Sequence, residues 1–458
     1  MRFSFLLLLP LTTIFFSYSS GIETFDSLLQ KSYNFSQKIN FPTQANQISV
    51  ITHNDKIKQS EITRHANNVR PIIYKPVMNL IEEFIIFKKH YGTPIEQKLY
   101  AQMTKLQFVD RLLTKRPLMF MTNKDWYLLR DGTTGNGNFE NIGTYHEQAP
   151  LTLENYLSYD EIQISALLGV SVPTYFINNG NRTNQAIPTN VKYYEEQGIY
   201  VGLVGARFEK PGLMEWQHMI ITPDQNKTET GYGNNPCLEN PQAKLLAIWA
   251  HLYNETFATF EKAQSDTSER YIKLGKDIYL DSIIYKKRIK IAAESFLVEA
   301  NERGREQNKN IYCHIVGLGL SCWKIDSRQN KLTLEAYSDI LRERNLPYIS
   351  DLDFSYFNNQ YHSCGGIKNL ETFATKTNAI TIHFSNRNAA DKLIGKDSGK
   401  LLVAMYAWDG NAYPGNEYWD NCLTASGDPA AACCSTIPEL QNPLINSNVS
   451  SKKLFVIN

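Results

Sequence analysis

Residues 311–323 read IYCHIVGLGLSCW, and this stretch decides the predicted fold. Its first half, residues 311–316, is a run of β-branched and apolar residues as long as a strand, which is typical of a strand covered on both faces. Gly317-Leu318-Gly319 then interrupts the run. Residues 332–345, LTLEAYSDILRERN, follow with apolar side chains near helical spacing. The stretch therefore predicts a buried strand, a glycine loop and a helix in succession.

The glycine loop has two interpretations. Because glycine lacks a Cβ atom, the backbone N–H groups of such a loop can approach a phosphate closely. Many loops between a strand and a helix use glycine only to turn the chain, so the motif alone is a weak signal. The polar residues near the predicted strand ends raise the weight of the phosphate interpretation.

Further strand-like runs lie on both sides of this stretch and alternate with helical patterns. They are residues 170–177 (VSVPTYFI), 199–209 (IYVGLVGARFE), 346–354 (LPYISDLDF), 379–385 (AITIHFS) and 400–408 (KLLVAMYAW). Strands separated by helical segments predict a three-layer α/β fold whose sheet is mostly parallel over residues 290–410.

Composition divides the chain into five segments. The predicted segments are a cleaved secretory signal peptide over 1–20, a polar lead-in over 21–75, a helical cap over 76–116, an α/β domain over 117–436 and a flexible tail over 437–458. The signal rests on Arg2 and the short apolar run after it, which ends in small residues. We therefore expect an exported or secreted protein.

The overall composition excludes several classes of protein. The chain has 458 residues, 42% apolar and 20% charged, with a net charge of +1, so nothing suggests binding to nucleic acid. No segment after the signal is apolar enough to cross a membrane, and we expect a soluble monomer.

The cysteines and histidines indicate no metal site or cofactor. The seven cysteines include no CxxC pair, so a structural zinc site is not expected, although one or two disulfides could involve Cys422, Cys433 or Cys434. The histidines within the apolar runs are expected to be core residues; they are His218, His314 and His383.

Polar residues gather where the predicted strands end, which is where open α/β sheets bind ligands. The carboxylates are Asp351, Asp353, Asp409 and Glu417, and the other candidates are Asn179, Asn181, Arg182 and Asn411. Carboxylates there could activate water, stabilise a developing positive charge or pair with a guanidinium group. Each could equally be a turn-capping or solvated acid with no chemical role.

The quoted loop and several other stretches resemble a divergent macrodomain family, that of the Legionella effector MavL and its bacterial and animal relatives. The stretches are 127–144, 156–182, 202–219, 314–325 (HIVGLGLSCWKI), 350–354 and 408–435 (WDGNAYPGNEYWDNCLTASGDPAAACCS). The resemblance implies an ADP-ribose-binding α/β fold in which Gly317, Leu318, Gly319 and Leu320 hold the diphosphate. It also implies that acids, without a metal, act on the distal ribose. The usual Asn-Ala-Ala-Asn and triple-glycine stretch is absent, and its nearest counterpart is FINNGNR at 176–182.

The first hypothesis is therefore a hydrolase that removes ADP-ribose from arginine side chains of a modified protein by cleaving the N-glycosidic bond. Asp409 is the leading catalytic candidate because it ends an apolar strand beside two glycine turns. Asp351 and Asp353 come next, and Glu417 last. The second hypothesis is a non-catalytic module that binds ADP-ribose or a related nucleotide. The third is a secreted glycan-active protein, whose acids would lie in an aromatic cleft without the glycine loop.

Overall fold

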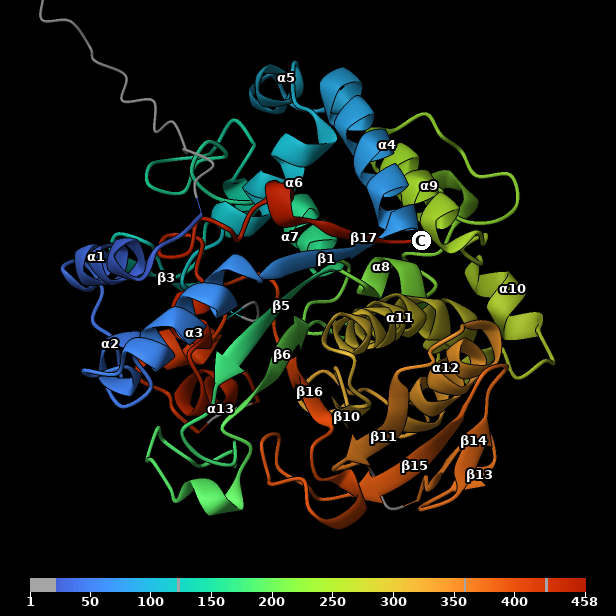
Figure 1. Cartoon of the computed structure of the whole chain (residues 1–458). Coiled ribbons are helices and arrows are strands. Elements are labelled where there is room, and N and C mark those ends of the chain that lie inside the picture. The colour runs from blue at the N-terminus through green and yellow to red at the C-terminus, as the bar shows by residue number, and fades with distance from the viewer. Residues whose placement is uncertain (1–21, 122–123, 358–359, 425–426) are drawn as a thin grey trace, which may run out of the picture.

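The computed structural model describes residues 22–121, 124–357, 360–424 and 427–458, and the structural statements below concern these residues. The predicted signal peptide lies outside them. A nine-stranded sheet forms the centre of the molecule (Figure 1). In spatial order its strands are β14 (Thr372–Ala374), β15 (Ala379–Ser385), β11 (Ile349–Ser355), β10 (Ile311–Val316), β16 (Leu401–Ala407), β6 (Gln197–Leu203), β5 (Leu168–Tyr175), β1 (Arg70–Tyr74) and β17 (Phe455–Ile457).

The middle of the sheet is parallel, and its margins are mixed. Neighbouring strands from β15 through β11, β10 and β16 to β6 all run parallel. Strand β14 is antiparallel to β15, and β5 is antiparallel to both β6 and β1. The predicted α/β class is confirmed, and the sheet is mostly parallel over residues 290–410, as expected. The parallel centre places the carboxyl ends of β6, β16 and β10 side by side.

Helices α11 (Ser282–Gln307) and α12 (Gln329–Glu343) cover one face of the sheet (Figure 1). The apolar residues that they bury against the sheet form a continuous core. They include Phe296, Leu297, Leu334 and Tyr337 from the helices and Ile311, Cys313, Ile315, Leu352 and Phe354 from the strands. The alternate residues Tyr312 and His314 of β10 face the other way and are also buried, which is why the run in the sequence does not alternate between apolar and exposed polar residues.

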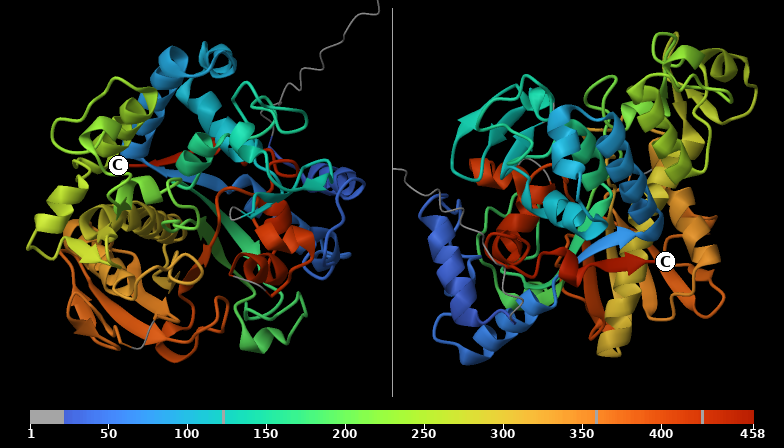
Figure 2. Two further views of the ribbon diagram at one scale, coloured as in Figure 1. Left: turned by 180° about the vertical axis from the view of Figure 1, so that it is seen from behind. Right: turned by 90° about the horizontal axis from the view of Figure 1, so that it is seen from above.

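The opposite face is covered by helices from both ends of the chain. Helix α3 (Lys56–Asn67) and α14 (Ile437–Leu440) contact β5, and α13 (Gly427–Cys434) contacts β16. The view from above in Figure 2 shows α11 on one side of the sheet and these helices on the other. The fold therefore has three layers, and the chain termini contribute to one of them.

The segment predicted as a polar lead-in is folded. It contains α1 (Phe25–Ser36), α2 (Ile48–Ile51), α3 and strand β1. Leu28, Ile48 and Ile62 are fully buried. These anchors are few and widely spaced among polar residues, so the sequence shows little periodicity although the segment packs against the core.

Three helices form the segment that was predicted as a helical cap over 76–116. They are α4 (Lys75–Tyr91), α5 (Pro94–Tyr100) and α6 (Lys105–Thr114). Thr93 and Thr104 begin the second and third helices through capping boxes. Lys88 lies between Glu96 at 2.5 Å and Asp160 at 2.6 Å, and this buried ion pair ties the cap to the body.

The remaining regular elements are short or connect the sheet to the surface. They are β2 (Met119–Met121), β3 (Trp126–Leu128), β4 (Thr134–Gly135), α7 (Tyr159–Ser165), α8 (Trp216–Met219), β7 (Ile220–Ile221), α9 (Pro241–Tyr253), α10 (Phe260–Ser265), β8 (Tyr271–Lys273), β9 (Tyr279–Asp281), β12 (Ser363–Cys364), β13 (Ile367–Lys368) and the 3-10 helices η1 (Phe139–Asn141), η2 (Val191–Tyr193), η3 (Thr228–Thr230), η4 (Gly395–Asp397), η5 (Asn416–Asp420) and η6 (Ser451–Lys453). None of the helices in the described part of the chain is both long and apolar enough to span a bilayer. All seven cysteines are free thiols.

The predicted flexible tail also forms part of the fold. Strand β17 pairs in parallel with β1, and Figure 1 shows the two side by side. Ile445 and Ile457 are buried, and the Asn446 side chain donates to the carbonyl oxygens of Ala66 at 3.0 Å and Leu440 at 2.9 Å. The tail was predicted to be flexible because it is polar, but its amides pair with the backbone and leave it ordered.

Substitution of Ile457 tests whether the tail contributes to stability. We predict that Ile457→Ala lowers the free energy of unfolding by about 2 kcal/mol or more, because a buried isoleucine loses its packing. Urea denaturation measures the change. Ile394→Ala is the matched control, since this side chain is 75% exposed, and it should change stability by less than about 0.5 kcal/mol. If both substitutions change the free energy of unfolding by an equally negligible amount, the tail is flexible, as the sequence predicts.

Candidate active site

A cavity of about 790 Å³ lies beyond the carboxyl ends of β6, β10 and β16. Gly205 and Glu209 line it after β6, Gly317 and Gly319 after β10, and Asp409 after β16. Because these strands are parallel neighbours, the segments that follow them meet at one edge of the sheet. The glycine loop and the leading acid candidate therefore share one site.

The glycine loop packs tightly against the backbone that follows β6. A Cβ atom on Gly319 would lie 2.9 Å from the carbonyl oxygen of Ala206, and Gly319 has a φ of +70°. A Cβ atom on Gly205 would lie 2.5 Å from the Gly319 nitrogen. Glycine is thus required at both positions by close approach of two backbones. Gly317, Gly319 and Leu320 line the cavity, whereas the Leu318 side chain is buried in the core.

Three carboxyl groups form an acid cluster next to the glycine loop in this site. Carboxylate oxygens of Asp409, Glu417 and Asp428 all lie within 4.8 Å of one another, a spacing at which they can share one cation. Asp409 follows β16, Glu417 lies in η5, and Asp428 lies in the first turn of α13. Asp428 is fully buried, and its Oδ1 accepts a hydrogen bond of 2.7 Å from the Gly415 backbone. The Asn416 side-chain amide donates to Asp409.

The electrostatics of this acid cluster favour the uncharged or cation-bound forms. Burial, with repulsion from Glu417 and Glu209, raises the pKa of Asp409 well above its usual value. Burial, with repulsion from Asp409 and Glu417, likewise raises the pKa of Asp428. Desolvation and like charges both disfavour a carboxylate. The acid cluster is therefore suited to bind a proton or a cationic group.

Asp428, Glu209 and Arg207 contribute to the site but were not among the predicted residues. Glu209 ends the run 199–209, and the reasoning from strand ends that found Asp409 would have found it too. Arg207 is buried and donates to the Asp409 carbonyl oxygen at 3.0 Å. Asp428 lies in the stretch 408–435 that carries the family resemblance, but its place in the site depends on the packing of α13 on β16.

Asp351 and Asp353 do not line the cavity. Both lie within β11, fully buried, and not beyond its end. Burial opposes ionisation of Asp351, but hydrogen bonds from His383 and Lys400 hold its pKa below the usual value. Asp353 accepts hydrogen bonds from Tyr312 at 3.0 Å and Ser385 at 2.7 Å. The two acids join neighbouring strands and make poor catalytic candidates.

The structure places one of the predicted amide and guanidinium donors at the cavity and the others outside its lining. Arg182 lines the cavity. The Asn179 side chain donates to Asp391 at 2.8 Å, and the exposed Asn181 accepts from the Thr183 backbone at 2.9 Å, so both stabilise loops. Asn411 is buried and is not a lining residue.

The three histidines are buried, as predicted. Burial lowers the pKa of His218 to about 3. His314 nevertheless lines the cavity, with its Nε2 3.1 Å from the Arg387 carbonyl oxygen. It therefore holds the segment that forms one wall of the site.

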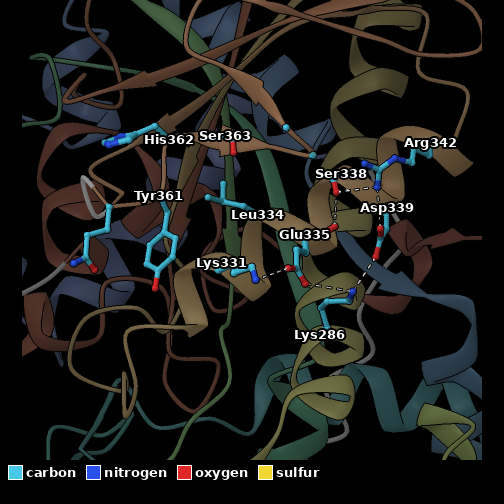
Figure 3. A pocket seen from close by; sticks show the side chains of 13 residues that line it. Lys286, Lys331, Leu334, Glu335, Ser338, Asp339, Arg342, Tyr361, His362 and Ser363 are labelled. Atoms are coloured by element: carbon cyan, nitrogen blue, oxygen red, sulfur yellow. Dashed lines mark hydrogen bonds and ion pairs between the residues drawn. The ribbon is translucent and has the colours of Figure 1, made fainter. Parts of the chain in front are cut away.

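A second cavity of about 580 Å³ lies between α12 and residues 360–366. Figure 3 shows that its charged side chains face one another. Lys286 lies 3.5 Å from Glu335 and 3.3 Å from Asp339. Arg342 also pairs with Asp339 at 3.2 Å. These charges are already neutralised, and neither the acid cluster nor the glycine loop lines this cavity, so the first cavity is the candidate site.

Comparison with known proteins identifies a family. Residues 26–458 match the family described as ADP-ribosylhydrolase MavL-like. The chain is 36% identical over 399 residues to a Drosophila melanogaster protein named ADP-ribosylarginine hydrolase CG2909, covering 85% of this chain and 78% of the relative. It is 37% identical over 403 residues to a second, ADP-ribosylarginine hydrolase CG3568, with the same coverage.

Substitution of Gly319 tests the role of the glycine loop. We predict that Gly319→Ala weakens ADP-ribose binding by about tenfold or more, because the new Cβ forces the loop away from Ala206. Isothermal titration calorimetry measures the affinity. Gly366→Ala is the matched control, since Gly366 also has a positive φ, +90°, but lies in the second cavity with open space around it. Unchanged affinity in a folded Gly319→Ala protein would exclude the loop as a ligand site.

Substitution of Asp428 tests the electrostatic strain of the acid cluster. The pKa of Asp428 is raised in the folded protein, so the folded state retains a proton that the unfolded state loses as pH rises. Stability must then fall with rising pH above the unfolded pKa of about 4, by up to about 1.4 kcal/mol per pH unit. Asp428→Asn removes this titration. Urea denaturation between pH 5 and pH 8 should show that the free energy of unfolding falls less with rising pH for the variant than for the wild type. The exposed Asp420→Asn serves as the control, and parallel curves for Asp428→Asn and the wild type would contradict the prediction.

Proposed function

The chain belongs to the MavL-like ADP-ribosylhydrolase family, and we propose that it removes ADP-ribose from arginine side chains of modified proteins. One structural observation supports this proposal: the glycine loop and two acids of the cluster, Asp409 and Glu417, line the same cavity. The names of the two Drosophila relatives support arginine as the linkage.

The two halves of the cavity suit the two ends of the substrate. Backbone approach at Gly317 and Gly319 suits a diphosphate, which needs N–H donors and space close to the main chain. The carboxylates of Asp409 and Glu417, which line the cavity in front of the buried Asp428, suit a guanidinium group, a planar cation with several N–H donors. A substrate that carries both groups, joined through a ribose, would place its N-glycosidic bond beside the acid cluster.

The chemistry then needs no group beyond water and the acids. The bond between the anomeric carbon and the guanidine nitrogen breaks, and its electron pair stays on the nitrogen. Positive charge develops on the ribose, and the carboxylate of Asp409 stabilises it. Water adds to the anomeric carbon, and its proton passes through a carboxyl of the cluster to the released guanidine. A carboxyl group whose pKa is raised by burial and by neighbouring acids is suited to accept and return that proton.

The competing hypotheses lose support. A glycan-active protein was expected to hold its acids in an aromatic cleft without the glycine loop, whereas here the loop and the acids share one cavity. A non-catalytic module would not require three acids to converge, and family membership supports turnover. We further propose that the sheet is of macrodomain type, that catalysis needs no metal and that the protein is exported.

Amide substitutions test the assignment of the catalytic acids. We predict that Asp409→Asn and Glu417→Gln each lower the rate of ADP-ribose release from an arginine-modified protein by about a hundredfold or more while keeping most of the affinity. Single-turnover kinetics measure the rate. Asp353→Asn is the control, since this acid is buried within β11 and does not line the cavity, and the variant should turn over like the wild type once folded.

Two results would overturn the assignment. Normal turnover in both cavity variants would place the chemistry elsewhere. A wild-type protein that binds ADP-ribose but never releases it from arginine, serine or acidic linkages would be a binding module.

A further inference from the structure

A buried network of two arginines and a glutamate lies behind Asp409. Arg207, Glu215 and Arg288 are each no more than 2% exposed. Arg288 Nε donates to Glu215 at 3.0 Å, and the Arg207 side chain lies 3.9 Å from the same carboxylate. The Arg207 backbone N–H also donates to Glu215, at 3.4 Å. Burying two guanidinium groups is costly, so their arrangement is expected to serve a purpose.

The network joins the strand ends that form the site. Arg207 Nη1 donates to the carbonyl oxygen of Asp409 at 3.0 Å. Arg288 Nη2 donates to the carbonyl oxygens of Gly205 at 3.2 Å and Ala166 at 3.1 Å. Asp409 follows β16, Gly205 follows β6, and Arg288 lies on α11. The network therefore fixes the backbone that carries Asp409 relative to the backbone that supports the glycine loop.

Arg207 also supplies positive charge where negative charge accumulates. The titratable groups that face Asp409 come from the segments packed around it. They are Glu417 from η5, Asp428 from α13, Cys322 from the loop after β10, and Glu209 and Arg207 from the segment after β6. Arg207 is the cation among these groups. Its guanidinium also lies 5.8 Å from the ring of Trp323, which lines the cavity.

We propose that Arg207 is a positioning residue for Asp409: it holds the main chain of Asp409 in place and offsets the charge of the surrounding acids. Arg207 acts behind the catalytic group and does not itself react with the substrate. The effect of Arg207 on turnover rests on the function proposed above, whereas its effect on the protonation of Asp409 does not.

The positive charge of Arg207 acts on the pKa of Asp409 in a known direction. Burial and neighbouring acids raise the pKa of Asp409, and Arg207 opposes this rise. Removing Arg207 must therefore raise that pKa further. If turnover needs ionised Asp409, the acid limb of the pH profile moves to higher pH by the same amount.

Three variants separate charge from packing. Arg207→Met removes the charge, and Arg207→Lys keeps it while losing the forked hydrogen bonds. Arg303→Met is the matched control, because Arg303 is 2% exposed, pairs with Glu299 at 2.6 Å on α11 and does not line the cavity. We expect the acid limb of the pH profile of kcat/KM to move to higher pH by about one unit in Arg207→Met alone. In Arg207→Lys it should stay in place while kcat falls about tenfold.

A second measurement does not depend on turnover. Infrared difference spectra against Asp409→Asn report the protonation of the Asp409 carboxyl in each variant. The proposal is supported if the Asp409 carboxyl loses its proton at a higher midpoint pH in Arg207→Met than in the wild type and Arg303→Met. This outcome does not require that the wild type shows hydrolysis. An unchanged midpoint, or an equal shift in Arg303→Met, overturns it. If Arg207→Met does not fold, Arg207→Lys decides, since wild-type kcat in that variant would exclude a positioning role.

Discussion

Repulsion between the carboxyl groups of Asp409, Glu417 and Asp428 is the constraint around which the site is built. Their oxygens lie within 4.8 Å of one another, and Asp428 is fully buried. Such an arrangement is unstable unless a cation, a proton or fixed dipoles offset it. The Gly415 backbone N–H and the Asn416 amide offset part of it from within the loop. The remainder is available to a positively charged substrate group.

The same residue type performs different tasks in this sheet because its partners differ. Asp351 lies within β11 and is held ionised by His383 and Lys400, so its charge is already neutralised. Asp409 lies just beyond β16, where acids surround it and the nearby cation contacts its carbonyl oxygen. A satisfied carboxylate stabilises the fold, whereas a carboxylate with unbalanced charge is poised for chemistry.

Much of the sheet could be predicted from local patterns. Residues 311–316 are apolar or aromatic at every position but His314 because both faces of β10 are buried, and Gly319 lies where the loop after β10 approaches the backbone after β6. The segments at both ends of the chain could not be predicted in this way. Their few buried anchors, such as Ile48 and Ile457, show no period, and their polar side chains pair with backbone groups far along the chain.

The sequence by itself determined the α/β class, the glycine loop and the position of Asp409 at the end of a strand, because each depends on residues that are adjacent in the chain. The tertiary structure alone decided which acids meet. Asp428 joins Asp409 through the packing of α13 on β16, and Asp353 is removed from the site by hydrogen bonds to neighbouring strands. Charge interactions act through space over a few ångströms, so their partners follow from the fold and not from spacing along the chain.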